Sequence, residues 1–336
     1  MGHDAPAPGQ FMAVELEQSV DVFVRAASLD LSQAAQRAGL GTSSAFYTIA
    51  RGSSDAAANI LSYEFMRELQ RPTTSLPPSV FSVGGGVSLG KAAGIVISQS
   101  GASDDLVQAA QGMREAGSPV VAITNTPGSR VEAQSTLTIP IDAGEEKAVP
   151  ATKTVVGSVA AGLSLLAALK PDYAAHLRRS VASFSEVENL PSKAHADLRD
   201  ALIGARHVYV VGRDTGFGAA HEIALKIKET CAIHAEAYSA SEVLHGPLQL
   251  ATKPMMVVVL DTGLASVADS LEQAVSRFQR AGVDLHRIRP QVLGLTPAAA
   301  AAALLRHIYP VILETALSLG MNPDAPEALS KVTVTR

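Results

Sequence analysis

Short apolar runs alternate with longer helical patterns along most of this 336-residue chain, and this alternation constrains its fold more than any other feature. The apolar runs have the length of buried strands. The patterns between them, about 10–15 residues long, carry apolar residues at helical spacing. A helix between two strands returns the chain to the same edge of the sheet, so the strands pair in parallel. The alternation therefore predicts an α/β fold with mostly parallel sheets and right-handed crossovers.

The predicted elements fall into two halves. In the first half we expect strands at 45–50, 80–83, 94–97, 119–123 and 137–139, and helices at 11–26, 29–40, 56–69, 103–116 and 152–168. In the second half we expect strands at 207–211, 232–235 and 255–260, and helices at 217–230, 264–281 and 303–319. Turns at 51–55 and 212–216 are expected to follow the first strand of each half. The more charged segment 171–203 is predicted to be a helical connection between two domains.

The two halves carry a weak internal repeat. Segment 49–52, followed by three alanines, has a counterpart in segment 210–213, followed by Gly-Ala-Ala. Gly52 and Gly212 both stand where a strand leaves the sheet, where glycine permits close backbone approach. The repeat favours a duplicated domain, although two unrelated α/β domains would share such glycines. A duplication would place a ligand beyond the carboxyl ends of the strands.

The composition is that of an ordinary globular protein, because 47% hydrophobic residues are enough for a full core. The net charge is −5 and no run of Lys or Arg stands out, so nucleic acid is not an expected partner. Cys231 is the single cysteine, so neither an intrachain disulfide nor a cysteine-based zinc cluster is expected. Residues 1–10 lack the pattern of a signal peptide. The longest apolar stretch, 155–169, is shorter than the roughly 20 residues that span a bilayer, and it is interpreted as a buried helix. We expect a cytoplasmic protein that does not bind membranes.

The segment from Ser98 to Ser103 is the strongest candidate for a ligand site. It places hydroxyl groups, an amide and Gly101 between a predicted strand and a predicted helix. Backbone N–H groups and the positive end of the helix dipole hold phosphate at such a position. The loop carries no cation and lacks the Gly-Lys-Ser/Thr ending of a nucleotide-binding P-loop, which favours a small phosphorylated metabolite. The alternative is that these serines only cap the helix.

Two further segments carry ionisable residues in informative positions. Glu222, Lys226 and Glu229 fall on one helical stripe, which is either part of a site or a solvated face with an ion pair. His234 and Glu236 alternate along a predicted strand, and such a polar stripe suggests a site.

His245 and Lys331 stand in less regular surroundings. His245 precedes a Gly-Pro turn, where a histidine is more often structural than catalytic. Lys331 lies in a tail with Pro-rich punctuation and with Val332 and Val334 in alternation, which indicates a segment docked in extended form; a frayed tail is the alternative. A desolvated lysine amine on a docked tail could attack a carbonyl as a Schiff-base nucleophile.

Taken together and in order, eight short segments of the chain resemble the sugar isomerase (SIS) family, and most closely the isomerase half of glucosamine-6-phosphate synthase. These segments are 52–54, 98–103, 124–129, 149–153, 224–229, 233–238, 242–247 and the ending 329–331, which matches that family's mobile C-terminal tail. The resemblance covers about residues 30–336. It implies two tandem flavodoxin-like αβα SIS domains, each with a mostly parallel central sheet. The implied organisation is a tail and helix (1–28), a first domain (29–170), the helical connection (171–203), a second domain (204–325) and an active-site tail (326–336).

The resemblance also implies which residues bind the substrate. The phosphate of a hexose 6-phosphate would be bound by Ser98, Gln99, Ser100 and Ser103. Ser54 and Val149 would line the sugar site, and Ser53 and Ser330 belong to the same motifs and are counted with them. Ser103 stands where the family has threonine, so the hydroxyl is kept. Ala151 stands where the family has serine, so one sugar contact is expected to be missing.

The catalytic roles that the resemblance implies agree with the chemistry of the side chains. Glu229 would be the base that moves a proton between C1 and C2, and Lys331 would form the Schiff base with the keto sugar. His245 would help to open the ring and would reach the site of the neighbouring subunit in a homodimer. Lys226 would lie near the ring-opening or proton-transfer groups. No cofactor and no metal are expected.

One departure from the synthase decides the expected activity. Gly2 stands where the mature synthase has its glutaminase cysteine, and only about thirty residues precede the first SIS domain. We therefore expect no glutaminase activity, and a chain like the second, synthase-like class of glucosamine-6-phosphate deaminase, which makes fructose 6-phosphate and ammonia. The alternatives are an isomerase or deaminase for another hexose phosphate, such as galactosamine 6-phosphate or a fructosamine-type conjugate, a chain similar only in a general way to glutamine–fructose-6-phosphate aminotransferase, or a non-catalytic sugar-phosphate sensor.

Overall fold

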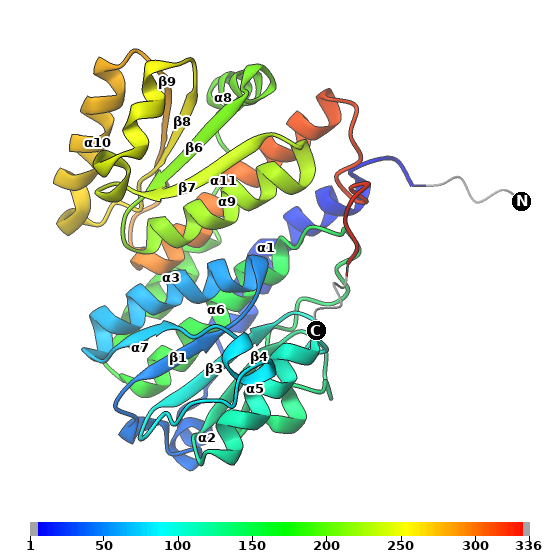
Figure 1. Ribbon diagram of the computed structural model, residues 1–336, viewed down its shortest axis with the longest axis vertical. Helices are drawn as coiled ribbons and strands as arrows, with labels where there is room; N and C mark the ends of the chain where they lie inside the picture. The colour runs from blue at the N-terminus through cyan, green and yellow to red at the C-terminus, as the bar shows by residue number, and fades with distance from the viewer. Residues whose placement is uncertain (1–5, 332–336) are drawn as a thin grey trace, which may run out of the picture.

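The computed structural model describes residues 6–331, and these residues form an α/β fold with two parallel sheets (Figure 1). The first sheet has the order β2-β1-β3-β4-β5 and the second has the order β7-β6-β8-β9. All their neighbouring strands pair in parallel. The strands are β1 (Phe46–Ile49), β2 (Thr73–Ser75), β3 (Ala93–Ser98), β4 (Val120–Thr124), β5 (Leu137–Pro140), β6 (His207–Gly212), β7 (His234–Ser239), β8 (Met256–Leu260) and β9 (Asp284–Ile288). The predicted α/β class with two parallel sheets is confirmed.

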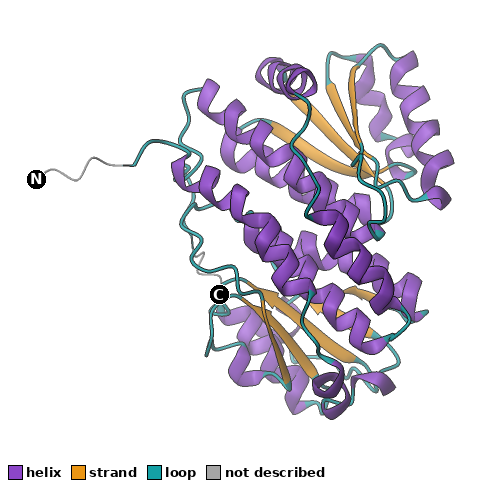
Figure 2. Ribbon diagram, turned by 180° about the vertical axis from the view of Figure 1, so that it is seen from behind, coloured by secondary structure: helices purple, strands orange, loops and turns teal. Residues whose placement is uncertain are grey.

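The helices lie on both faces of each sheet, and several of them fill the space between the sheets. They are α1 (Gln10–Ala27), α2 (Ser32–Arg37), α3 (Gly52–Leu69), α4 (Ser79–Ser82), α5 (Asp104–Glu115), α6 (Lys153–Leu169), α7 (Tyr173–Phe184), α8 (Ser192–Gly204), α9 (Thr215–Cys231), α10 (Ala268–Arg280) and α11 (Pro297–Ser318). Helices α1, α3, α6, α9 and α11 form the layer between the two sheets (Figures 1 and 2). Every residue of β3, β4 and β8 is buried, since helices cover both faces, which explains their continuous apolar sequences.

The prediction was wrong where strands are polar. Residues 80–83 were expected to be a strand, but Ser79–Ser82 is a single helical turn, α4, which begins directly after Pro77-Pro78. The strand that pairs with β1 is instead the polar segment Thr73–Ser75. Strand β9, at the edge of the second sheet, was not predicted. Strands β2 and β9 are edge strands with largely polar sequences, so they lack the apolar run that marks a buried strand.

Several helix ends also differ from the prediction. Helix α3 begins at Gly52, inside the expected turn 51–55. Helix α11 begins at Pro297 rather than 303, because its six consecutive alanines favour helix and Thr296 caps it, accepting a hydrogen bond from Ala299 N at 3.4 Å. Strand β7 covers 234–239 rather than 232–235, because Ala232 adopts φ +52° at the end of α9.

The predicted connection 171–203 consists of two helices that pack on the rest of the protein. Helix α7 lies against α1 and α6, and α8 lies against α11. The domain boundaries themselves stay a prediction.

Helix α11 is long and apolar enough to cross a membrane by length and composition alone, but 78% of its most apolar window is buried inside the protein. Helix α6 is buried from Lys153 to Leu166, as predicted for 155–169.

Helices α3 and α9 join the two halves through direct backbone contact. A Cβ atom at Gly218 of α9 would lie 2.6 Å from both the backbone nitrogen and Cγ1 of Ile60 in α3. The same two helices share an ion pair, because Arg67 of α3 donates hydrogen bonds to Glu64 and to Asp214, the N-cap of α9. Glycine is therefore needed at position 218 for the two helices to approach this closely.

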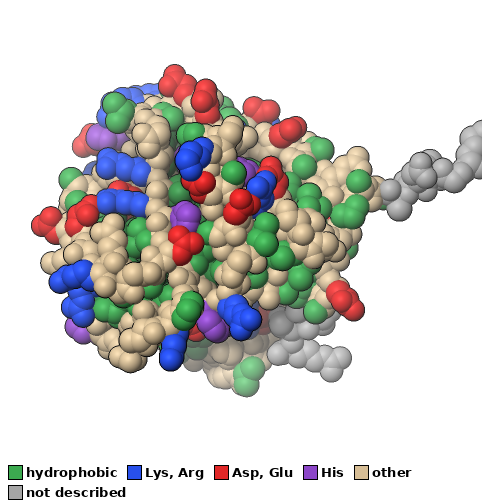
Figure 3. Space-filling model, turned by 90° about the horizontal axis from the view of Figure 1, so that it is seen from above, with side chains coloured by type: hydrophobic (Ala, Val, Ile, Leu, Met, Phe, Trp, Pro, Cys, Tyr) green, Lys and Arg blue, Asp and Glu red, His purple; other side chains and the backbone are tan. Residues whose placement is uncertain are grey.

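On the face of the protein shown in Figure 3, acidic and basic side chains lie interspersed.

Candidate functional site

A hollow of about 340 Å³ lies where β1 and β3 end, between the first turns of α3 and α5. In the order β2-β1-β3, the connections leave β1 and β3 in opposite directions, and parallel sheets bind ligands beyond such a switch point. The last turns of α9 and the C-terminal segment complete the wall. The residues that line the hollow are Arg51, Gly52, Ser53, Ser54, Ile97, Ser98, Gln99, Ser100, Ser103, Leu106, Val149, Ala151, Lys226, Glu229, Leu329, Ser330 and Lys331.

The structure brings together nearly all of the residues singled out from the sequence. All eight predicted substrate-binding residues line this hollow, and so do Lys226, Glu229 and Lys331. His245 does not line it: this side chain is exposed, in the short 3-10 helix Glu242–His245. His234 and Glu236 are half-exposed on β7, with 4.0 Å between His234 Nε2 and Glu236 Oε1, and they do not line the hollow either. The roles of all these residues stay predictions.

The loop from Ser98 to Ser103 is held in one conformation by its own hydrogen bonds. Gly101 has φ +58°, and a Cβ atom there would lie 2.2 Å from Ser129 Oγ, so only glycine fits. The N–H group of Gly101 donates to Ser98 Oγ at 3.1 Å. Ser103 is the N-cap of α5, but its side chain makes no capping hydrogen bond. The hydroxyl of Ser103 is therefore not used as a helix cap, which was the alternative to phosphate binding.

Glu222, Lys226 and Glu229 form a buried ionic cluster rather than a solvated face. Glu222 and Lys226 are fully buried. Lys226 Nζ donates a hydrogen bond to Glu229 and lies 3.5 Å from Glu222 Oε1. The hydroxyl of Tyr309, from α11, donates to the same Glu222 oxygen at 2.9 Å. Glu229 is the member that reaches the hollow, so the cluster connects the hollow to the core.

Burial sets the charge states in this cluster. Burial, opposed by the charge of Lys226 and assisted by that of Glu229, raises the pKa of Glu222 to about 7. Burial alone would lower the pKa of Lys226, but the two carboxylates raise it above its ordinary value, so this amine stays charged. Burial and Glu222 raise the pKa of the Tyr309 hydroxyl, which remains a donor.

Replacing Glu222 with glutamine is expected to change how stability depends on pH. Glu222 has a pKa of about 7 in the folded protein against 4.5 for the free side chain, so the folded state binds more protons between these values. Its contribution is therefore present below pH 4.5 and is lost as pH rises to about 7. The difference in unfolding free energy between the wild type and Glu222→Gln should decrease from pH 5 to pH 7.5, as measured by urea denaturation. Glu17→Gln, at an exposed position of α1, is the control, and parallel curves for wild type and Glu222→Gln would contradict the assignment.

Lys331 is anchored beside the hollow by a residue that the sequence did not reveal. Its amine donates to Glu146 Oε2 at 3.2 Å and to the carbonyl of Ala148 at 2.6 Å. Glu146 is buried and also accepts hydrogen bonds from the N–H groups of Thr152 and Thr154. The loop that holds Lys331 is therefore continuous with the loop that carries Val149 and Ala151.

The segment before Lys331 is anchored on helix α1 (Figure 1). The carboxylate of Asp324 accepts hydrogen bonds from the N–H groups of Phe11 at 3.0 Å and Met12 at 2.8 Å, and its carbonyl accepts from Val149 N at 2.8 Å. These contacts agree with the prediction of a docked tail, although residues 326–331 form no strand and residues 327–328 form a turn. Val332 and Val334, part of that prediction, lie outside the described residues.

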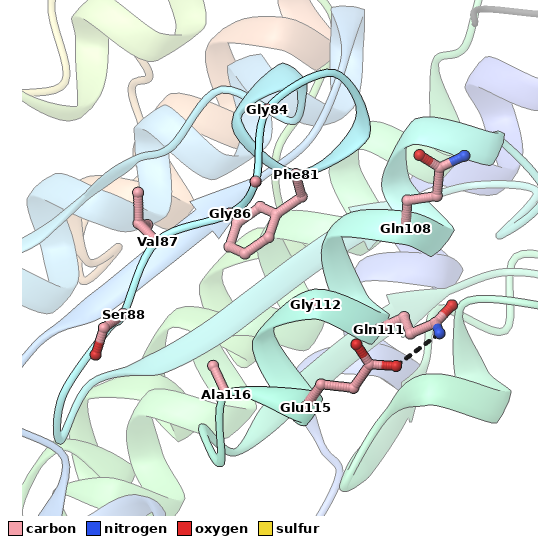
Figure 4. Close-up of a pocket in the computed structure, with 11 residues that line it drawn as sticks. Phe81, Gly84, Gly86, Val87, Ser88, Gln108, Gln111, Gly112, Glu115 and Ala116 are labelled. Carbon is pink, nitrogen blue, oxygen red and sulfur yellow. Dashed lines mark hydrogen bonds between the residues drawn. The ribbon is translucent and has the colours of Figure 1, made fainter.

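Another hollow, of about 610 Å³, lies beside α5 and is lined mostly by residues without ionisable side chains (Figure 4). Phe81 and the Gly84–Gly86 segment face Gln108, Gln111 and Glu115 of α5, and Gln111 donates to Glu115 at 2.7 Å. Glu115 is the one ionisable side chain among its lining residues.

Among residues 6–331, no group of three or more His, Cys, Asp or Glu side chains is placed to hold a metal ion, and the expectation of no metal and no cofactor stays a prediction.

Comparison with protein families and curated sequences gives one consistent result. A family model described as the SIS domain matches residues 42–168 and 201–284. The glutamine–fructose-6-phosphate aminotransferase (isomerizing) of Sulfurisphaera tokodaii is 30% identical over 251 residues, which are 71% of this chain and 41% of that protein. The chain thus spans about two-fifths of the length of the curated relatives that it matches.

Solved structures with the same fold cover almost the whole chain. A protein of Silicibacter pomeroyi, provisionally described as a phosphosugar isomerase, is 31% identical with a TM-score of 0.80, over 92% of this chain and 99% of that one. The glucosamine-6-phosphate deaminase of Thermotoga maritima has a TM-score of 0.78 over 97% of this chain and 100% of that one. Its 19% identity makes this a likeness of fold alone.

Proposed function

From the premise that this chain belongs to the SIS domain family, we propose that it is a phosphosugar isomerase that converts glucosamine 6-phosphate and water to fructose 6-phosphate and ammonia. One observation carries the proposal: Glu229, from α9, and Lys331, from the C-terminal segment, line the same hollow as the hydroxyl loop 98–103. A carboxylate and an amine beside an anion-binding loop are what an aldose–ketose isomerisation of a phosphorylated sugar requires. The relatives named above for isomerising enzymes support the reaction class.

The proposed reaction begins when the sugar ring opens with its phosphate on the loop 98–103. Glu229 removes the proton from C2 of the open aldehyde form and returns a proton to C1, while the C1 oxygen gains a proton and the C2 nitrogen loses one, so that C1 becomes an alcohol and the C2 amine becomes a C2 imine. The Lys331 amine, once deprotonated, adds to C2 and expels ammonia, and this leaves a Schiff base between Lys331 and the sugar. Water then adds to C2 and releases Lys331, and the water oxygen becomes the keto oxygen of fructose 6-phosphate. Lys226, buried beside Glu229, donates a hydrogen bond to that carboxylate and would hold it in position.

The direct test is incubation of the protein with glucosamine 6-phosphate, followed by measurement of ammonia and fructose 6-phosphate. Both products are expected in equal amounts. Absence of both at high enzyme concentration would remove the proposal. Fructose 6-phosphate offered with ammonia or with glutamine would test the reverse direction, because the curated relatives are named as aminotransferases.

Other hexose phosphates are the alternative substrates within the same proposal. Galactosamine 6-phosphate and a fructosamine-type conjugate carry the same phosphate and a similar carbonyl carbon, and Ala151 removes one contact that the family's serine would make. Borohydride trapping with each sugar in turn would separate these candidates, because only a true substrate forms the Schiff base with Lys331. A sensor without activity would trap none of them.

Three finer predictions belong to this proposal. We describe each domain as flavodoxin-like, because the order β2-β1-β3-β4-β5 is that of the flavodoxin-type sheet. The order β7-β6-β8-β9 of the second sheet corresponds to the first four strands of that arrangement. We propose a homodimer in which His245 serves the partner's site, because His245 is exposed away from the hollow of its own chain. The cytoplasmic location stays a prediction.

A further inference from the structure

The helix end that faces the candidate phosphate site is unusually acidic. Asp104 and Asp105 occupy the first turn of α5, directly after Ser103. Two carboxylates at this position stabilise the helix but would repel a phosphate dianion. Each is paired with an arginine from a distant part of the chain: Arg51 binds Asp105, and Arg130 binds Asp104. The two arginines therefore neutralise the end of the helix.

Arg51 differs from Arg130 because it lines the hollow. Its Nε and Nη2 donate to the same oxygen of Asp105, Oδ2, at 2.8 and 2.6 Å. The Asp105 side chain is 1% exposed, and its other oxygen accepts from Leu106 N at 2.9 Å. The helix backbone thus holds the buried carboxylate of Asp105 in place, two residues after Ser103. This carboxylate in turn holds one edge of the Arg51 guanidinium.

The other edge of this guanidinium is available to a ligand. A guanidinium has five N–H groups, and Asp105 takes two of them. Within residues 6–331, the remaining three have no hydrogen-bond partner, and the Arg51 side chain is 53% exposed. The other two cations that line the hollow are occupied: Lys226 by Glu222 and Glu229, and Lys331 by Glu146 and Ala148.

We propose that Arg51 binds the phosphate group of the substrate and supplies the charged hydrogen-bond donor that the hydroxyl loop 98–103 lacks. An arginine can bind a carboxylate with one edge and a phosphate with the other, and charge-assisted hydrogen bonds of this kind are about twice as strong as neutral ones. The inference rests on the proposed function, in which the hollow binds a phosphorylated sugar. The sequence analysis did not identify this residue, because the loop 98–103 itself carries no cation and Arg51 precedes a different helix. Burial raises the pKa of Asp55, and the charge of Arg51 is the smallest of the opposing effects, so Asp55 is a second carboxylate in the neighbourhood of this side chain.

The test measures binding rather than turnover, by calorimetry on the full chain. The ligands are glucosamine 6-phosphate, inorganic phosphate and unphosphorylated glucosamine. Arg51→Gln is expected to raise the Kd of the two phosphate ligands by about ten- to a hundredfold and to leave glucosamine unchanged. Arg130→Gln is the matched control, because it breaks an Arg–Asp pair on the same helical turn but outside the hollow, and its Kd values should stay within about threefold of wild type.

A second variant guards against misfolding. Arg51→Gln leaves the buried Asp105 without its partner, whereas the double variant Arg51→Gln/Asp105→Asn removes both charges. Weaker phosphate binding in the folded double variant supports the assignment. If the double variant binds glucosamine 6-phosphate as tightly as Arg130→Gln does, Arg51 is not a phosphate ligand and the proposed function is untouched. If wild-type protein binds neither phosphate ligand, the phosphosugar site itself is wrong, and this inference with it.

Discussion

Replacing Glu229 with glutamine is expected to lower the turnover of glucosamine 6-phosphate by about 10²–10⁴-fold, the usual loss when a general base is removed. Glutamine has nearly the same shape but cannot accept the C2 proton. KM should change little, because the phosphate is proposed to bind a different part of the hollow, the loop 98–103. The measurement is steady-state kinetics of ammonia release, together with loss of deuterium incorporation at C1 of fructose 6-phosphate in deuterated water.

The control for this variant is Glu236→Gln. Glu236 is a half-exposed carboxylate on β7 that does not line the hollow, so its replacement should leave turnover unchanged. Thermal unfolding of both variants is needed, because Glu229 also pairs with the buried Lys226. A folded Glu229→Gln protein with turnover within a factor of three of wild type would show that another group removes the proton.

Replacing Lys331 with alanine is expected to abolish covalent trapping of the sugar by borohydride and to lower turnover by more than about 10²-fold. Borohydride reduces the Schiff base to a stable amine, so the wild-type protein should gain the mass of one reduced sugar phosphate per chain. Mass spectrometry of the trapped protein locates the adduct.

Lys331→Arg separates the chemistry of this residue from its anchoring role. Arginine can still donate hydrogen bonds to Glu146 and to the Ala148 carbonyl, but it forms no Schiff base under these conditions. It should therefore be as inactive in trapping as alanine. Lys228→Ala, at an exposed position of α9, should trap normally. Full deamination by Lys331→Ala would overturn the Schiff-base assignment.

The sequence predicted those parts of the site that lie within single segments. The loop 98–103, the stripe with Lys226 and Glu229, and the end of the tail are each recognisable because spacing along the chain fixes which residues share a face or a turn. The same holds for the apolar strands of both sheets. Polar edge strands such as β2 and β9 were missed or misplaced because they carry no periodic apolar signal.

Contacts between distant segments could not be predicted from the sequence. Arg51 and Asp105 are 54 residues apart, and Lys331 and Glu146 are 185 residues apart. Which charge meets which depends on the strand order and on the path of the tail, and neither leaves a local pattern. Burial could not be predicted either. The spacing of Glu222 and Lys226 fits a solvated helix face as well as it fits the buried cluster that Tyr309 completes.

The close contact of α3 with α9 has a consequence for how the proposed sugar substrate would enter and leave. Helix α3 begins at the hollow with Ser53 and Ser54, and α9 reaches it with Lys226 and Glu229, so one wall comes from each half of the chain. Because Gly218 packs against the backbone of Ile60, the two walls cannot swing apart about a hinge without unpacking the centre of the molecule. Residues 327–330, by contrast, are exposed. We therefore expect exchange to occur by displacement of this short segment, and the release rate of product to respond to its anchor on α1, Asp324, while the walls stay rigid.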